Sequence, residues 1–220
     1  MDIREKLLSA AACIYAEAGY RGATTRRIAQ EAGVNEITLF RHFGSKDALL
    51  LEALHHCGRV PDLPPLPDIP ENPARELTAW CVEHHATLYE KRSLIRTCMG
   101  EMAERPEMGK PATAGPCAAA AILRGYFVRL RERGIATGDF DPDTAAWMLL
   151  ATIFADAMWR DVMVSEHAAW GPADESMAEC VRMILTAIGA PSGPRHGLAD
   201  PIAPKPRGAR ARSTITRAAP

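Results

Sequence analysis

The chain of 220 residues has few of the features that mark membrane-spanning or secreted proteins. Its most apolar segment, AAWMLLATIFADAMW, is interrupted by Thr152 and Asp156. It therefore falls short of the roughly 18 uninterrupted apolar residues that a transmembrane helix needs. The opening sequence MDIREKLLSAA has helical character and no signal-peptide pattern. We therefore expect a cytoplasmic protein with no membrane partner.

Cysteine and catalytic motifs are also sparse. The six cysteines form no CxxC pair, which favours reduced core residues over disulfides. Cys81 and His85 are four residues apart, and His55, His56 and Cys57 are adjacent. Each group offers at most two ligands on one helix face, where zinc needs three or four. No P-loop, nucleophile elbow or zinc-hydrolase motif is present, so we predict neither a metal, a cofactor nor an enzymatic activity. The cysteines are Cys13, Cys57, Cys81, Cys98, Cys117 and Cys180.

The chain also lacks an excess of charge of either sign. Its formal net charge is −1, so no global field attracts nucleic acid and any DNA affinity must come from local clusters. Arg26 and Arg27 form one such cluster in the first turn of a predicted helix. The helix dipole disfavours cations there, and a nearby phosphate reverses that effect. Contact with a phosphate is the favoured reading for Arg26, whereas Arg27 fits a solvated side chain equally well.

The segment from Thr24 to Lys46, TTRRIAQEAGVNEITLFRHFGSK, predicts two short helices joined by a tight turn. Thr25 is a candidate cap for the first helix, which Gly33 ends. Asn35 caps the second helix, whose apolar stripe of Leu39, Phe40 and Phe43 needs a covering partner. The pattern is therefore helix, glycine turn, helix.

The outward face of the second helix is unusual for a solvated surface. If Leu39 and Phe43 are buried, the helical period places four other groups on the outward face: a methyl-rich side chain, a hydroxyl, a guanidinium and an imidazole. These groups suit thymine methyls, base-edge acceptors and phosphates in a DNA major groove. The four residues are Ile37, Thr38, Arg41 and His42. Lys46 follows at the start of a third helix, which is a candidate seat for an anion.

Residues 1–56 resemble the amino-terminal DNA-binding domain of TetR/AcrR-type bacterial transcriptional regulators, through ATTRRIAQEAGV, TLFRHFGSK and a following AL. The resemblance implies a dimer that binds double-stranded operator DNA and an unidentified, apolar small-molecule effector. The family pattern usually has a small residue at position 37 and a tyrosine at position 40, where this chain has Ile37 and Phe40. The operator of a relative therefore cannot be assumed. The DNA-binding residues expected are Thr25, Arg26, Glu36, Ile37, Thr38, Phe40, Arg41, His42 and Lys46.

Composition divides the chain into four parts. We predict an all-α fold with a helix-turn-helix head over residues 1–57, a proline-rich linker over 58–72 and a helical body over 73–190. Residues 191–220 carry six basic residues against one acid and have no apolar period, so a disordered basic tail is expected. The tail fits a nonspecific phosphate-binding arm or a solubilising segment without a role.

Apolar periodicity predicts the helices of the body. Helices are expected over about 73–90, 94–102, 117–133, 142–163 and 174–188, with a loop around 109–116. Asn72 and Asp141 are the caps before Pro73 and Pro142, which occupy first helical positions. The two terminal helices carry more apolar surface than one body needs, which favours a four-helix bundle at a dimer interface.

The resemblance also implies a ligand pocket and a dimer face in the body. Methionine and aromatic residues suit an adaptable apolar pocket, although each is more commonly a core residue. The ligand-binding residues expected are Trp80, Met99, Met102, Phe127, Trp147 and Phe154. The dimer-interface residues expected are Ile153, Met177, Val181, Ile184 and Ile188.

We interpret the sequence as a dimeric transcriptional regulator, favouring a repressor that an apolar ligand releases from a palindromic operator. One alternative is a helical interaction protein that has kept the head without specific DNA binding. Another is a small-molecule-binding or catalytic body with a vestigial head. Sequence-selective, salt-dependent DNA binding distinguishes the first interpretation from both alternatives.

Overall fold

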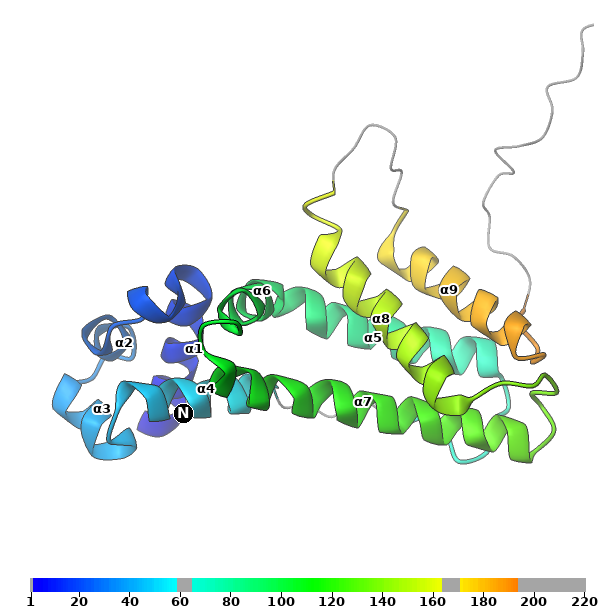
Figure 1. Ribbon diagram of the computed structural model, residues 1–220, viewed down its shortest axis with the longest axis horizontal. Helices are drawn as coiled ribbons and strands as arrows, with labels where there is room; N and C mark the ends of the chain where they lie inside the picture. Colours follow the sequence, from blue (N-terminus) through cyan, green and yellow to red (C-terminus); the bar gives the residue numbers. More distant parts are fainter. Residues whose placement is uncertain (1, 59–64, 164–170, 194–220) are drawn as a thin grey trace, which may run out of the picture.

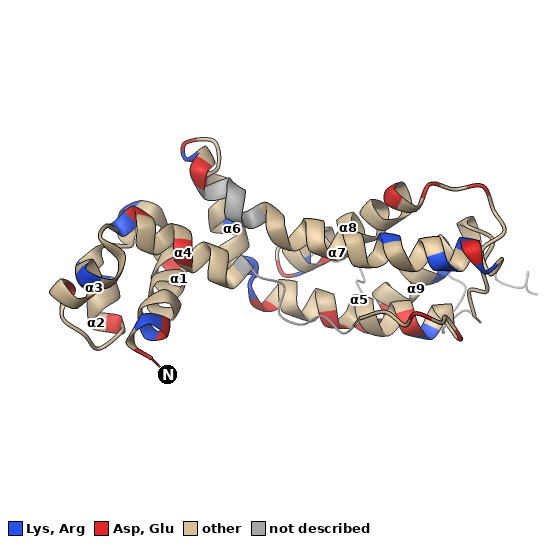
Figure 2. Cartoon of the chain, turned by 90° about the horizontal axis from the view of Figure 1, so that it is seen from below, with Lys and Arg blue, Asp and Glu red and all other residues tan. Residues whose placement is uncertain are grey.

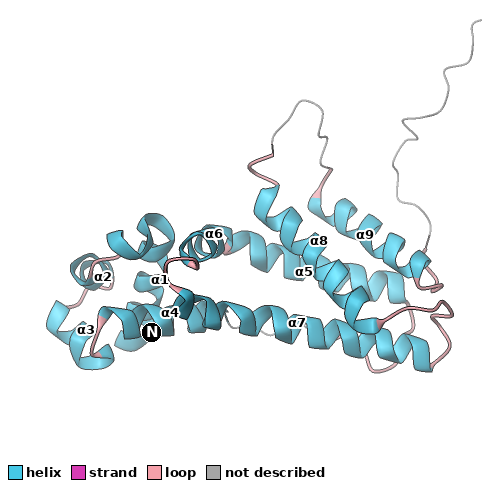
Figure 3. Ribbon diagram, viewed as in Figure 1, coloured by secondary structure: helices cyan, strands magenta, loops and turns pink. Residues whose placement is uncertain are grey.

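The computed structural model of the protein describes residues 2–58, 65–163 and 171–193, and only the backbone of residues 108–112. In these ranges the chain forms helices and no strand, which confirms the all-α prediction (Figure 3). The molecule is elongated, with α2 and α3 at one end and α9 near the other (Figures 1 and 2). Residues 59–64 of the predicted linker and 194–220 of the predicted tail lie outside the described residues.

The head consists of four helices, and a side chain caps the start of each. They are α1 (Ile3–Gly22), α2 (Thr25–Glu31), α3 (Glu36–Phe43) and α4 (Lys46–Gly58). Asn35 caps α3 by accepting a hydrogen bond from the Ile37 N–H at 2.9 Å. Thr24, and not Thr25 as predicted, caps α2 by accepting from the Arg27 N–H at 3.3 Å. The chain is already helical at Thr25, so its hydroxyl is free for another contact.

The body consists of five helices. They are α5 (Pro73–Glu90), α6 (Arg92–Glu101), α7 (Pro106–Glu132), α8 (Pro142–Trp159) and α9 (Ala173–Ala187). Of these, α5 and α8 start at the predicted caps. Asn72 accepts from the Arg75 N–H at 3.1 Å, and Asp141 accepts from the Thr144 N–H at 2.7 Å. Proline occupies the first turn of α5 and α8, where its missing N–H has no intrahelical partner to lose.

The predicted loop around residues 109–116 is wrong, because α7 continues through it from Pro106 to Glu132. Pro111 and Pro116 each remove a backbone N–H from the helix interior, which favours a break when a segment is judged alone. In the folded chain, α7 runs the length of the body and packs against α4, α6 and α8. Tertiary packing therefore outweighs the local cost of the prolines.

The buried residues form one core in the head and a second in the body. In the head, Leu7, Leu39 and Leu49 are fully buried, and α1 packs against α4 and α2. In the body, Leu77, Tyr126 and Leu149 bring α5, α7 and α8 together. Each buried leucine stabilises the fold by roughly 1.5–3 kcal/mol relative to an exposed one. Cys98 of α6 belongs to the core of the head, so α6 connects the two units.

The carboxyl end of α6 is fixed to the kinked end of α1. The Glu101 carboxylate accepts hydrogen bonds from the Tyr15 hydroxyl at 2.9 Å and from the Tyr20 N–H at 2.7 Å. This approach needs Gly19, where the backbone has φ 63° and ψ −173° inside α1. A Cβ at Gly19 would lie 2.6 Å from a Glu101 oxygen. The Thr97 hydroxyl adds a bond to the Ala16 carbonyl at 3.1 Å.

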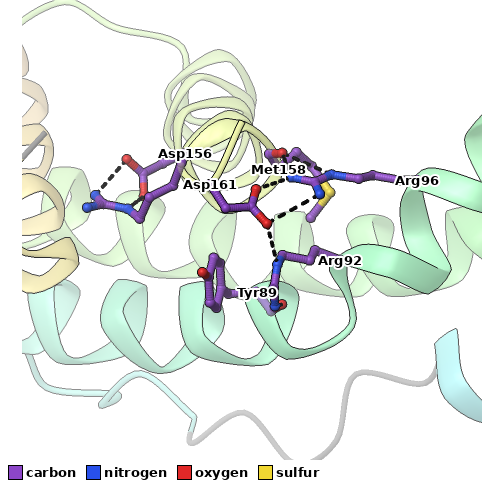
Figure 4. A network of polar contacts seen from close by, with 7 residues as sticks. Tyr89, Arg92, Arg96, Asp156, Met158 and Asp161 are labelled. Atoms are coloured by element: carbon purple, nitrogen blue, oxygen red, sulfur yellow. Dashed lines mark hydrogen bonds and ion pairs between the residues drawn. The ribbon is translucent and has the colours of Figure 1, made fainter. Parts of the chain in front are cut away.

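The amino end of α6 is fixed to the end of α8 by an arginine pair (Figure 4). Arg92 Nε donates to the Asp161 carboxylate at 2.9 Å, and Arg96 Nε donates to the Met158 carbonyl at 3.1 Å. Arg96 also pairs with Asp161. The hydrogen bonds from Arg96 and Arg92 lower the pKa of Asp161 to about 2. A helix of ten residues is therefore held by polar contacts at both ends.

Replacing Gly19 by alanine should destabilise the protein by about 2–3 kcal/mol. The new residue would adopt a backbone conformation that only glycine tolerates well, and its Cβ would displace Glu101. Chemical denaturation measures the free energy of unfolding. The matched control is Gly33→Ala, because Gly33 has φ 68° but open space around a Cβ. Gly33→Ala should lower the free energy of unfolding by only about 1 kcal/mol. Equal decreases for the two variants would contradict a role for the Glu101 contact.

Candidate nucleic-acid interface and ligand cavity

Helix α3 presents an apolar and cationic face at the end of the head. Leu39 and Phe43 are buried against the other helices of the head, as predicted. Ile37 is 74% exposed, and Arg41 and His42 are exposed beside it. Such large exposed apolar surface is unfavourable in water unless a partner covers it.

Phe40 differs from its predicted place in the buried stripe, because it is 44% exposed. The helical period separates it from Leu39 and Phe43, so the core of the head does not enclose its ring. Thr38 is half-buried at the edge of the outward face. The exposed side of α3 therefore combines two large apolar side chains with a guanidinium and an imidazole.

A side-chain hydrogen bond fixes α3 relative to α2. The Thr25 hydroxyl donates to the Glu36 carboxylate across the turn. Gly33 in that turn has φ 68°, a left-handed conformation that favours glycine. Thr25 and Glu36, both predicted to contact DNA, therefore bond to each other and orient the exposed face.

The two arginines at the start of α2 have different surroundings. The Arg27 guanidinium lies 3.4 Å from the Glu17 carboxylate and donates to the Gly22 carbonyl at 3.5 Å. Arg26 is exposed, and no hydrogen bond or ion pair joins it to another described residue. The structure thus leaves Arg26 available for a phosphate and engages Arg27 within the head.

Lys46 does not point outward as an anion seat. Its ammonium donates to the Tyr20 carbonyl and lies 4.0 Å from the centre of the Tyr20 ring. Burial is the main cause that lowers the pKa of Lys46. A phosphate contact by Lys46 would require the ammonium to leave Tyr20, so Arg26 and Arg41 are the better placed cations.

A cavity of about 500 Å³ lies in the body next to the end of the head. Its walls come from α5, α6, α7 and α8, and Leu54 and Cys57 of α4 close one side. Four predicted ligand residues line it, and the other two do not. The lining residues are Met99, Met102, Trp147 and Phe154.

Trp80 and Phe127 are the incorrect ligand predictions. Both belong to the body core, with Trp80 2% exposed and Phe127 fully buried. Apolar periodicity marks a buried face and does not distinguish a core from a cavity wall. The prediction also omitted His84, which lines the cavity. The sequence feature that could have identified His84 is its position as a polar residue within the apolar stripe that includes Leu77 and Leu88.

A second polar group is buried between α5 and α8. Asp156 is 4% exposed and accepts two hydrogen bonds from Arg160, each 2.8 Å long. His85 Nε2 lies 2.6 Å from the same carboxylate. His85 thus lies within ion-pair distance of an acid. Within the described ranges, no three His, Cys, Asp or Glu residues gather as a metal site, and no helix is long and apolar enough to cross a membrane.

The predicted dimer residues are mostly buried within one protomer, which corrects that prediction. Ile153, Met177, Val181 and Ile188 are each at most 3% exposed in the single chain. Ile184 is partly buried against the same core. Their apolar stripe faces the protomer's own body, and of the five residues Ile184 alone is partly exposed. The exposed apolar residues of α8 and α9 are Trp147, Met148, Trp159 and Met183.

A short helix with an exposed apolar and cationic face, held by a glycine turn against a preceding helix, is the geometry of a helix-turn-helix DNA-binding domain. The model of bacterial regulatory proteins of the TetR family matches residues 7–53. The model of the AefR-like transcriptional repressor C-terminal domain matches residues 77–190. The chain belongs to the TetR family of bacterial transcriptional regulators, which are DNA-binding proteins and not enzymes.

Similar proteins cover nearly the whole chain. The transcriptional repressor KstR2 of Mycolicibacterium smegmatis is 24% identical over 203 residues, which are 88% of this chain and 94% of that protein. A TetR-family regulator from Mesorhizobium loti has a TM-score of 0.68 at 20% identity, over 86% of this chain and 97% of that chain. One from Agrobacterium tumefaciens has a TM-score of 0.68 at 22% identity, over 86% and 96%. At this identity the solved structures show the fold alone.

Replacing Thr38 or Arg41 by alanine should weaken binding to the preferred operator by about 1–3 kcal/mol and affect a scrambled duplex little, because base contacts discriminate. The operator is selected from a random duplex pool, and affinities are measured at several salt concentrations. Arg26→Ala is the comparison. It should weaken both duplexes equally and reduce the salt slope by about 1 per subunit. If Thr38→Ala and Arg41→Ala lower the affinity for both duplexes by the same factor, α3 does not read bases.

Proposed function

We propose that the protein is a cytoplasmic repressor that binds a palindromic operator as a homodimer and is released by a small apolar molecule. The observation that carries the proposal is the position of the cavity. It touches Leu54 and Cys57 at the end of α4, four residues of α6, and Met102 directly after it, and α6 is the helix that joins head and body. A molecule in the cavity therefore contacts both connections to the DNA-binding helices.

The exposed face of α3 supports direct reading of base pairs. Ile37 and Phe40 offer apolar contact for thymine methyls, and Arg41 offers a donor fork for guanine. Family members of this architecture place such a helix in the major groove. Two heads then read two half-sites one or more helical turns apart, about 34–36 Å or a multiple.

The exposed side of α8 supports a dimer. Met148, Thr152, Ala155 and Trp159 follow the helical spacing and are all exposed in the single chain. Met183 of the neighbouring α9 is 60% exposed. An apolar stripe over two adjacent helices fits a second copy related by a two-fold axis, which would also set the separation of the heads.

Replacing Met148 by glutamate should convert the dimer into monomers and weaken operator binding by at least tenfold, because the new charge would be buried without a partner. Sedimentation velocity reports the oligomeric state. The matched control is Ile69→Glu, since Ile69 and Met148 are both 61% exposed and Ile69 lies outside α8 and α9. Ile69→Glu should remain dimeric. A Met148→Glu protein that stays dimeric would exclude this face as the interface.

The contacts of α6 offer a route from cavity to head. Cys98, Met99 and Met102 line the cavity, and Glu101 between them holds Tyr15 and Tyr20 of α1. A ligand that moves this turn of α6 changes the position of Glu101 and therefore of α1. Displacement at both heads alters their separation on the operator, which lowers DNA affinity.

A compound that binds the cavity should lower the affinity of the protein for operator DNA. Operator DNA should lower the affinity for the compound by the same factor, as linkage requires. Candidates come from thermal-shift screening, and the two affinities are measured by fluorescence anisotropy and calorimetry. Glu101→Ala removes the bonds to α1 and should reduce the coupling factor, while compound affinity changes little. A tightly bound cavity compound that leaves DNA affinity unchanged would contradict induction.

A further inference from the structure

Two polar side chains in the cavity wall are engaged elsewhere. The Thr87 hydroxyl donates to the Glu83 carbonyl at 3.1 Å within α5. The Lys91 ammonium donates to the Cys57 carbonyl at 2.7 Å. That carbonyl lies in the last turn of α4, where the helix dipole favours a cation. Neither group is free to bind a ligand without losing an existing contact.

His84 differs from both, because it is buried and has a polar atom without a partner in the described part of the chain. Its side chain lines the cavity and is 5% exposed, and its buried Nδ1 has no hydrogen-bond partner among the described residues. The imidazole instead packs on Trp80, with ring centres 5.0 Å apart. Buried nitrogens of Trp80, His85 and Arg129 also have no hydrogen-bond partner among the described residues, but these residues do not line the cavity. A buried polar atom without a partner is unfavourable, and a ligand can supply the missing bond.

The His84 ring is neutral at physiological pH. Burial, with a smaller contribution from His85, lowers the pKa of His84 to about 4. A neutral imidazole carries one donor and one acceptor nitrogen. The imidazole can therefore accept a hydrogen bond from a hydroxyl or donate one to a carbonyl.

We propose that the cavity takes an uncharged, mainly apolar molecule with one hydroxyl or carbonyl group, and that His84 hydrogen-bonds that group. The inference rests on the proposed effector site and adds the chemistry of its ligand. An anionic ligand is disfavoured because a carboxylate must lose its hydration here, and the neighbouring cation Lys91 is held by Cys57. A pure hydrocarbon would leave the His84 nitrogen without a partner.

Three fluorescent probes of one skeleton test the proposal on the full chain. They are 1-pyrenemethanol, 1-methylpyrene and 1-pyrenecarboxylate, which offer a hydroxyl, no polar group and an anion. The alcohol should bind roughly five- to tenfold more tightly than the hydrocarbon, as one hydrogen bond to a buried group implies. The carboxylate should bind no more tightly than the hydrocarbon.

Variants of His84 assign this preference to the imidazole. His84→Phe should reduce the ratio of alcohol to hydrocarbon affinity to about one, whereas His84→Gln keeps a donor and an acceptor and should retain most of it. Gln also serves if Phe disturbs folding, since a folded His84→Gln protein must still prefer the alcohol. The matched control is His55→Phe, because His55 is an exposed histidine that does not line the cavity. It should behave as the unaltered chain.

A cavity-filling variant separates the role of His84 from the existence of the site. Ala151 lines the cavity from α8, and Ala151→Trp should weaken all three probes. If Ala151→Trp does so but His84→Phe leaves the affinity ratio unchanged, the role of His84 is wrong and the effector site stands. A preference for the carboxylate that Lys91→Met removes would also overturn the proposed ligand class. Probe binding that Ala151→Trp leaves unchanged would place the probes elsewhere and overturn the effector site itself.

Discussion

The position of α6 is the constraint on which the rest of the structure depends. At one end the Glu101 carboxylate holds the α1 backbone at Tyr20, and at the other Arg92 and Arg96 hold Asp161 after α8. A single ion pair between partly exposed side chains contributes little to stability, so the main effect of these contacts is to fix the position of α6. They keep a short helix in one register between two hydrophobic cores. The cavity lies against this helix and between the two cores, because its wall includes Leu54 and Cys98 of the head core and Leu150 of the body core.

The body separates buried charge from the cavity. Asp156 is paired with Arg160 and lies 2.6 Å from His85, so its charge is compensated on α5 and α8. His84, the next residue, has no acid beside it and remains neutral in the cavity wall. Adjacent residues of a helix point about 100° apart, which sends one imidazole to an acid and the other to an apolar space. A single turn of α5 thereby supplies both a structural contact and a recognition group.

Sequence patterns predicted most of the helices and the outward face of α3, because both depend on local signals. Asn35, Asn72 and Asp141 cap as expected, and the exposed residues of α3 follow from the burial of Leu39 and Phe43. Long-range packing was not predictable in the same way. It keeps α7 helical through Pro111 and draws Lys46 to Tyr20. Periodicity also identified the apolar stripe of α9 without showing whether it faces the same chain or a partner.

Local charge placement explains how a nearly neutral protein can be selective on DNA. With a net charge of −1, the chain gains little from long-range attraction, so nonspecific binding should be weak at physiological salt. At the α3 end, the exposed cations Arg26 and Arg41 flank apolar side chains that gain only from contact with base edges. The phosphate contribution is equal for all sequences, so any discrimination must come from contacts with the bases. A low ratio of cations to apolar contacts therefore favours discrimination over affinity, and the proposed two-fold dimer would restore affinity by binding two half-sites at once.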